Sequence, residues 1–277
     1  MKNNYEKPVS ELLEFGEADW REWDDYSVFG FTKEHIPELI RLGKDRTLII
    51  GAADAELGYA ALWAPLHAWR ALVQMQATEA IFPLLDVFDW GDETDSDLIS
   101  EGLSDAFRKF GPAVIEPLAM FLHEPYHNMW AYVSAPEILG RIGVKHPESR
   151  DRVIEIITAA LDEKYEHNDG DINGYWISDL LDLKAVESYP VIKKAFDAKK
   201  VNLRIVGDLE DVELEFGMRE KRDTPAPNTP ISPDLMRIFQ EMDSAQKAGR
   251  DGKNVKKKEK NKQKQAKKSR KRNRKKK

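Results

Sequence analysis

Two short stretches have residue types and spacing typical of metal sites. In the first, His123, Glu124 and His127 match the letters H-E-x-x-H. In zinc peptidases, two histidines one helical turn apart hold the metal and the glutamate acts as a base. Here Pro125 stands between the histidines and opposes the continuous helix that this arrangement needs. The sequence therefore favours a helix that ends near His123, followed by a loop, over a zinc site.

The second stretch begins as a calcium-binding loop does. Asp169, Asp171 and Asn173 occupy every second position, as the first ligands of such a loop would. The twelfth position, where a bidentate glutamate belongs, is Leu180. We therefore expect a turn in which Asp171 or Asn173 caps the following helix, and we expect no metal ligand in either stretch.

A third candidate is an acidic segment around Trp90 and Gly91. Such a segment could bind a cation or a basic partner, but a run of carboxylates is more often simply solvated. In that case Asp95 or Ser96 would cap the next helix. The carboxylates of this segment are Asp89, Asp92, Glu93, Asp95 and Asp97.

Aromatic and basic side chains at helical spacing could line a ligand groove. His67, Trp69 and Arg70 are the closest such group, but at this spacing packing is the more common use. The same expectation, core or ridge packing, covers the tryptophans Trp63, Trp130 and Trp176. The sequence has no cysteine and no recognisable nucleophile–base pair or nucleotide-binding glycine loop. We therefore expect no catalytic residue, no cofactor-binding residue and no cofactor.

The strongest chemical signal is a C-terminal run of basic residues. Residues 253–277 contain 16 Lys or Arg and one acid, whereas residues 1–252 contain 27 basic and 48 acidic residues, a net charge of −21. Nucleic-acid phosphates attract such a polycation through counterion release, and the tail has no aromatic residue for base stacking. The predicted nucleic-acid-binding residues are Lys256, Lys257, Lys258, Lys267, Lys268, Arg270, Lys271, Arg272, Arg274 and Lys275.

Other uses of the tail remain open. An anionic membrane surface, a targeting signal or the acidic body of the same chain would also attract it. We favour RNA or the ribosome, because the tail lacks an apolar anchor for a membrane. Stable membrane insertion is not expected, since no apolar run approaches the roughly 20 residues of a span. The first residues lack the apolar stretch of a signal peptide, so a cytoplasmic location is expected.

Helical periodicity dominates the elements that must position these groups. The clearest helix is predicted within residues 34–43, with Thr32 as its N-cap and Gly43 as its end. Two segments, 201–205 and 212–216, alternate as strands do. For the second of these we favour a short helix capped by Asp208.

A repeat of helix pairs is visible in the positions of proline. Four apolar segments carry an early proline, which suits the first turn of a helix: 36–39, 82–85, 116–119 and 189–192. A partner helix precedes each of the last three of these segments. Small residues in the partner helices would let neighbouring helices approach closely: Ala68, Ala71, Ala106, Ala135, Gly140 and Gly143. Paired helices at a period of roughly 30–45 residues predict a stacked α-solenoid.

These patterns resemble two known groups of proteins. The alternation of an Ala-x-x-x-Leu-Gly-type helix with an Ile-x-Pro-Leu-type helix resembles HEAT-like repeats, especially the short bacterial variety related to phycobilin-lyase repeats. The segments 25–26, 31–36, 63–72 and 182–187 are similar to those of largely uncharacterised bacterial HEAT-like proteins. The resemblance implies a curved helical scaffold. Some such proteins end in a cysteine-rich zinc-binding tail, which a chain without cysteine does not have.

The expected fold is all-α: a HEAT-like α-solenoid of stacked helix pairs with a disordered polybasic C-terminal tail. The expected segments are an aromatic and acidic N-terminal cap (1–31), a repeat body (32–218), a proline-rich linker (219–233), an amphipathic helix (234–248) and the tail (249–277). The expected function is that of a non-enzymatic scaffold whose body binds a protein partner and whose tail contacts RNA or another polyanion. The alternative is a bilin-lyase-like chaperone or enzyme, which requires a ligand-sized polar cleft between the N-terminal and central repeats.

Overall fold

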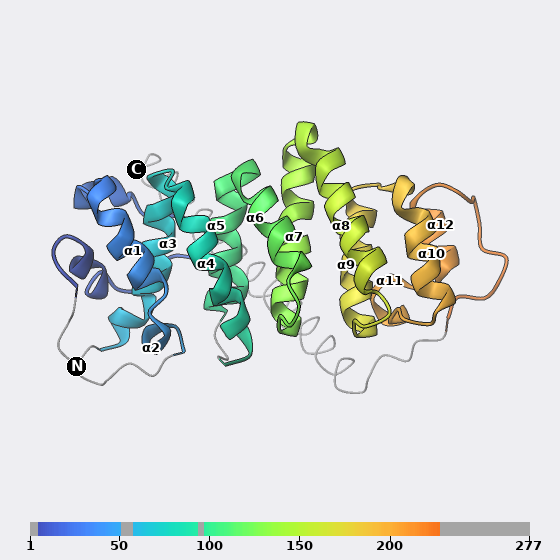
Figure 1. The fold of residues 1–277 in the computed structure, drawn as a ribbon, viewed down its shortest axis with the longest axis horizontal. Coiled ribbons are helices and arrows are strands. Elements are labelled where there is room, and N and C mark those ends of the chain that lie inside the picture. Colours follow the sequence, from blue (N-terminus) through green and yellow to red (C-terminus); the bar gives the residue numbers. More distant parts are fainter. Residues whose placement is uncertain (1–4, 51–57, 94–96, 228–277) are drawn as a thin grey trace, which may run out of the picture. The chain divides into compact units, whose positions relative to one another are not determined.

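Helices make up the regular structure of this protein. The computed structural model describes residues 5–50, 58–93 and 97–227, and within these ranges it contains no strand (Figure 1). The prediction of an all-α fold is therefore confirmed. The predicted amphipathic helix (234–248) and all the predicted nucleic-acid-binding residues of the tail lie outside the described residues.

The main helices follow one another at short intervals along the chain. They are α1 (Ile36–Gly43), α3 (Ala64–Gln74), α4 (Ile81–Leu85), α5 (Ser104–Phe110), α6 (Ile115–His123), α7 (Met129–Lys145), α8 (Arg150–Lys164), α9 (Gly170–Asp182) and α10 (Tyr189–Asp197). The remaining α-helices of the described residues are α2 (Arg46–Ile49), α11 (Leu203–Val206) and α12 (Leu209–Glu215). Before α1, the 3₁₀ turns η1 (Val9–Leu13), η2 (Tyr26–Phe29) and η3 (Lys33–His35) form the N-terminal segment. Further 3₁₀ turns include η4 (Tyr59–Trp63) and η6 (Asp86–Glu93), and the π-helical turn η7 (Leu98–Leu103) leads into α5.

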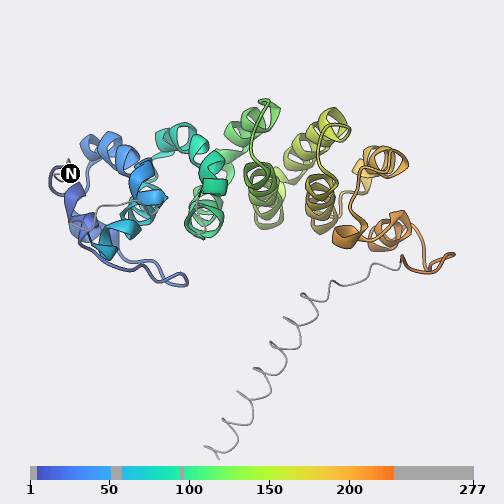
Figure 2. The ribbon, with the colours of Figure 1, turned by 90° about the horizontal axis from the view of Figure 1, so that it is seen from below.

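The helices of residues 5–227 lie in two layers. In one layer α3, α5, α7 and α9 each contact the next, and in the other α1, α4, α6, α8 and α10 do so. Figure 2 shows these helices nearly end-on, with the two members of a pair in different layers. Each pair packs mainly on its neighbours, which is how helical-repeat proteins bury apolar faces that one pair cannot cover alone. The predicted stacking of helix pairs is confirmed.

Local signals account for many helix ends. Pro37 lies in the first turn of α1 and Pro190 in that of α10, and α1 ends at Gly43 as predicted. Asp208 caps α12 by accepting a hydrogen bond from the backbone N–H of Asp211, so the helix predicted there is confirmed. The strand-like pattern of 201–205 is misleading, because Asn202 caps the helical turn α11 through the N–H of Arg204.

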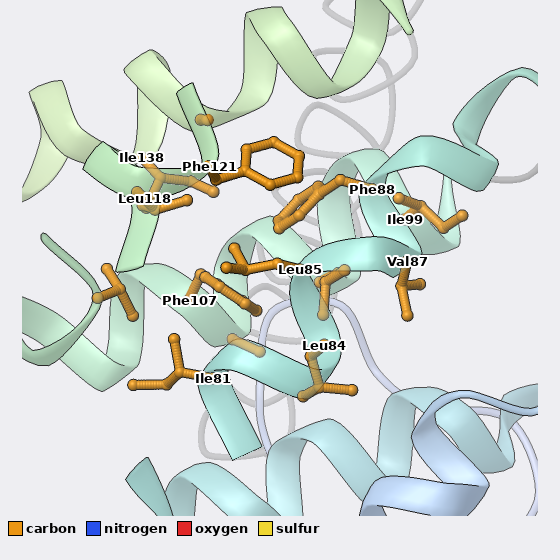
Figure 3. Close-up of a cluster of buried hydrophobic side chains, with 14 of the residues drawn as sticks. Ile81, Leu84, Leu85, Val87, Phe88, Ile99, Phe107, Leu118, Phe121 and Ile138 are labelled. Carbon is orange, nitrogen blue, oxygen red and sulfur yellow. The ribbon is translucent and has the colours of Figure 1, made fainter. Parts of the chain in front are cut away.

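A continuous apolar core runs between the layers. Figure 3 shows its central part, where Phe88, Phe107 and Phe121 meet beside Ile81, Leu84 and Leu118. The rings of Phe88 and Phe107 pack edge to face with their centroids 5.1 Å apart, a favoured aromatic geometry. The three phenylalanines come from η6, α5 and α6, and Ile81 and Leu84 come from α4, so one cluster joins four elements of neighbouring repeats.

Small residues set the closest helix contacts, as predicted. A Cβ on Gly143 of α7 would lie 2.8 Å from Leu183 Cδ2, and a Cβ on Gly140 would lie 3.5 Å from Asp179 Cβ of α9. The same holds between α1 and α3, where a Cβ on Gly43 would lie 2.8 Å from the ring of Trp69. The indole Nε1 of Trp69 donates to the Gly43 carbonyl at 2.8 Å, so ring and backbone are in direct contact.

Ion pairs hold the segment after α12 against that helix. Arg219 pairs with Glu210 and Glu213, and Arg222 pairs with Asp208 and Asp211. The hydrogen bond from Arg222 lowers the pKa of the Asp208 carboxyl below its usual range. We call this set of ion pairs the C-terminal clasp.

Candidate functional site

The two histidines of the H-E-x-x-H stretch have different structural partners. The helix α6 ends at His123, as predicted, and His123 Nδ1 lies 2.9 Å from a carboxylate oxygen of Glu163 on α8. His127 contacts the Asp89 carboxylate at 2.8 Å through Nδ1 and the Phe121 carbonyl at 2.8 Å through Nε2. Both nitrogens of His127 are thus engaged with protein oxygens, and the geometry does not bring the two histidines together.

Asp89 corrects the expectation that the acidic segment is only solvated. Its Oδ1 accepts the backbone N–H of Asn128 at 3.0 Å while its Oδ2 meets His127. Asn128 in turn caps α7 by accepting the N–H of Ala131 at 2.8 Å. Asp89 therefore fixes the start of α7 against η6. The other capping candidates, Asp95 and Ser96, lie outside the described residues.

The stretch that resembles a calcium loop forms a capped helix start, but the predicted capping residue is wrong. Asp169 caps α9 by accepting the N–H of Asp171 at 2.9 Å, because Asp169 is the last residue with an extended backbone. Asn173 is instead buried and donates to the carbonyls of Tyr165 and Lys200. Across the residues that the structure describes, no group of three or more His, Asp or Glu is placed to hold a metal ion.

The N-terminal segment packs its rings against the first repeat helices. Phe15 stacks edge-on against Phe29 and lies 4.9 Å, between ring centroids, from His67 of α3. Trp20 packs edge-on against Trp63 at 5.7 Å. Trp69 and Trp176 are fully buried and Trp130 lies half exposed on the surface, which fits the expected core and ridge positions.

A hydrogen-bonded chain joins this segment to α3. The Nε2–H of His67 donates to the Gly16 carbonyl at 3.0 Å, so Nδ1 is left to accept the hydroxyl of Tyr26 at 2.6 Å. Burial raises the pKa of Tyr26 to about 12, so its hydroxyl keeps the proton that it donates. Burial also lowers the pKa of His67, which favours the neutral ring that this chain requires.

We expect His67 to make the protein less stable in mild acid. A base whose pKa is lower in the folded than in the unfolded chain contributes its full stability above the unfolded value, and loses it as the pH falls from about 6.5 downward. Urea denaturation at several pH values between about 7.5 and 5.5 measures this loss. The loss should be smaller in His67→Gln than in the wild type. Equal pH dependence in wild type and His67→Gln would contradict the assignment.

Next to this chain, the structure has a cleft of about 470 Å³. It lies between the N-terminal segment, α3 and the η7–α5 region, and it is lined by Trp20, Arg21, Trp23, Arg70, Asp97, Glu101, Gly102, Asp105, Arg108 and Lys109. We call it the cap cleft. Its volume falls in the range of small-molecule and peptide side-chain sites.

Trp23 forms one wall of the cap cleft and is held from three sides. Its Nε1 donates to an Asp105 carboxylate oxygen at 3.0 Å. Arg70 lies over its ring at 5.1 Å from the centroid, and Lys109 lies over it at 4.8 Å. These cation–π contacts and the hydrogen bond fix the indole in a site where aromatic or apolar groups can pack.

Arg70 is the most unusual group of the cleft. Its side chain is 1% exposed, and its Nε and Nη1 atoms are buried without a hydrogen-bond partner. By contrast, Arg108 in the same cleft donates to Glu137 at 2.9 Å. A buried guanidinium needs acceptors for its N–H groups, and none of the described residues supplies one to Nε or Nη1 of Arg70.

Sequence reasoning placed Arg70 in a packed helix but missed its lack of partners. All residues of α3 from Ala64 to Leu72 are buried, because the N-terminal segment covers the face that would otherwise be open. The aromatic composition of residues 5–31 predicts that this segment covers the first repeat. It does not indicate which side chain of the repeat becomes enclosed.

The fold and the cleft define the class of this chain as an all-α helical-repeat protein. The chain belongs to the family described as "Protein of unknown function (DUF1186)", which matches it over residues 32–225. No curated protein and no solved structure matches the chain. Among the helices that the structure describes, none combines the length and apolar composition that crossing a membrane requires.

Proposed function

We propose that this chain is a non-enzymatic binding scaffold of HEAT-like repeats, with a body that binds a protein partner and a basic tail that contacts RNA or another polyanion in the cytoplasm. The observation that carries the first part is the cap cleft. Its lining of indoles, cations and carboxylates consists of groups that recognise charged and aromatic side chains. The two-layer stacking of helix pairs supports the HEAT-like description.

The charge distribution supports the second part. The tail carries 16 basic residues against one acid, whereas the preceding residues have a net charge of −21. A polyanion is attracted to the first and repelled by the second, so the two functions belong to separate parts of the chain.

One observation favours a second candidate function. A bilin-lyase-like chaperone or enzyme requires a ligand-sized polar cleft between the N-terminal and central repeats, and the cap cleft lies between the N-terminal segment, α3 and α5. In this case the cleft would hold a small molecule and the tail would have an independent role.

Affinity purification with and without nuclease tests the scaffold proposal. We expect one set of protein partners that survives nuclease treatment and deletion of residues 253–277, and a second, RNA-dependent set that either treatment removes. A single set that disappears under both treatments would contradict a protein-binding body. A small molecule bound to the purified body in stoichiometric amount, without a protein partner, would favour the second candidate instead.

A further inference from the structure

Two N–H groups of Arg70 without acceptors point to a ligand. The guanidinium is buried at 1% exposure, and the N–H groups on Nε and Nη1 have no acceptor. Enclosing a charge in this way is strongly unfavourable unless an anion completes the site. The cation–π contact with Trp23 at 5.1 Å supplies no hydrogen-bond acceptor, so it does not replace that anion.

The rest of the cap cleft restricts which anion fits. Three carboxylates, Asp97, Glu101 and Asp105, line the cleft beside the basic residues. They would repel a ligand with several negative charges, such as a nucleic-acid backbone or a diphosphate. The indoles of Trp20 and Trp23 offer an apolar wall beside these charges.

We propose that Arg70 is the anion-binding residue of the cap cleft and that it takes a single carboxylate carried beside an aromatic or apolar group. The proposal rests on the proposed function, because the carboxylate is that of an acidic side chain of the protein partner. The guanidinium donates to the carboxylate oxygens, and the indoles of Trp20 and Trp23 pack against the neighbouring apolar group.

Benzoate is the simplest probe of this site, and benzamide is its neutral counterpart of similar shape. We expect benzoate to raise the melting temperature of the full chain saturably, and benzamide to have no such effect. Arg70→Met should lower the affinity for benzoate at least tenfold, the effect of losing a charged hydrogen bond. Arg21→Met removes an exposed cation of the same cleft and should lower it no more than about fivefold. Equal binding of benzamide, or equal loss in both variants, would overturn the proposal.

The ligand-free stability of Arg70→Met gives a second readout. Methionine is uncharged but shorter than arginine, so the variant loses an incompletely paired charge and also the contact with Trp23, and its melting temperature without ligand should stay within a few degrees of the wild type. A melting temperature lower by roughly 10 °C or more, the effect of breaking a buried ion pair, would mean that an anionic group of the free protein already pairs with Arg70. The proposal would then be wrong, whatever the effect on benzoate.

An end-capped peptide with Glu beside Phe, and its Gln counterpart, identifies the source of the carboxylate. If the Glu peptide binds at least tenfold more tightly than benzoate and the Gln peptide does not, a protein partner is supported. Binding of benzoate without binding of the Glu peptide would uphold the role of Arg70 while overturning a protein partner in this cleft. Failure of both probes to bind would overturn the Arg70 proposal and leave the RNA-binding tail unaffected.

Discussion

Replacing Trp176 by alanine is expected to lower the free energy of unfolding by about 3–5 kcal/mol. Trp176 lies on α9 and is fully buried. Its Nε1 donates to the Tyr132 carbonyl at 2.6 Å, and the centroids of the Trp176 and Tyr132 rings lie 6.0 Å apart. The substitution leaves a cavity between α7 and α9 and an unpaired carbonyl beside it, and both effects act in the same direction.

Urea denaturation of the two chains measures this effect. The matched control is Tyr175→Ala, because Tyr175 is the preceding residue of the same helix but its side chain is 38% exposed. That substitution should cost much less, since little apolar surface is lost and no cavity forms. Similar losses in the two variants would show that α9 does not pack between its neighbours as described.

Replacing five basic residues of the tail by glutamine is expected to weaken RNA binding roughly 100-fold or more at about 0.1 M salt. The five are Lys267, Lys268, Arg270, Lys271 and Arg272. Each phosphate contact on a single strand contributes about 0.7 to the slope of log affinity against log salt, so the five substitutions should flatten this slope by up to about 3.5. The effect is large because counterion release is the main source of such affinity.

Fluorescence anisotropy with an arbitrary RNA at several salt concentrations measures both quantities. A tail with the same composition in scrambled order is the matched control, and it should bind as the wild type does, because backbone contacts do not read sequence. An affinity that hardly depends on salt, or that survives the five substitutions, would place RNA binding elsewhere in the chain or exclude it.

Local signals in the sequence predicted several elements correctly. Gly43 ends α1 and Asp208 caps α12 because these residues act on the backbone within a few positions of themselves. The small residues Gly140 and Gly143 of α7 were also identified, since helix pairs that repeat along the chain must approach closely somewhere on their faces. Helical periodicity and its repetition were sufficient for the fold class.

The candidate site depended on contacts between residues distant in the sequence, and these were missed. Asp89 was expected to be solvated, but it contacts His127 and Asn128. In the sequence these two residues follow Asp89 only after the helices α5 and α6. The burial of Arg70 depends on an N-terminal segment that folds over α3. No pattern around either residue encodes such a partner, whereas helix caps and periodicity are encoded within one or two turns.

The C-terminal clasp makes the stability of the last repeat depend on salt. Apolar burial holds most of the body, but charge holds residues 219–223 to α12, through Arg219 and Arg222. Added salt screens these pairs, whose side chains keep 16–34% of their surface exposed, more than it weakens an apolar core. The end of the body should therefore be the first part to open to proteases or hydrogen exchange at high ionic strength, while α7 to α9 stay closed. A chain shortened to residue 218 would carry the same weakness permanently, because the carboxylates of α12 would face one another without their arginines.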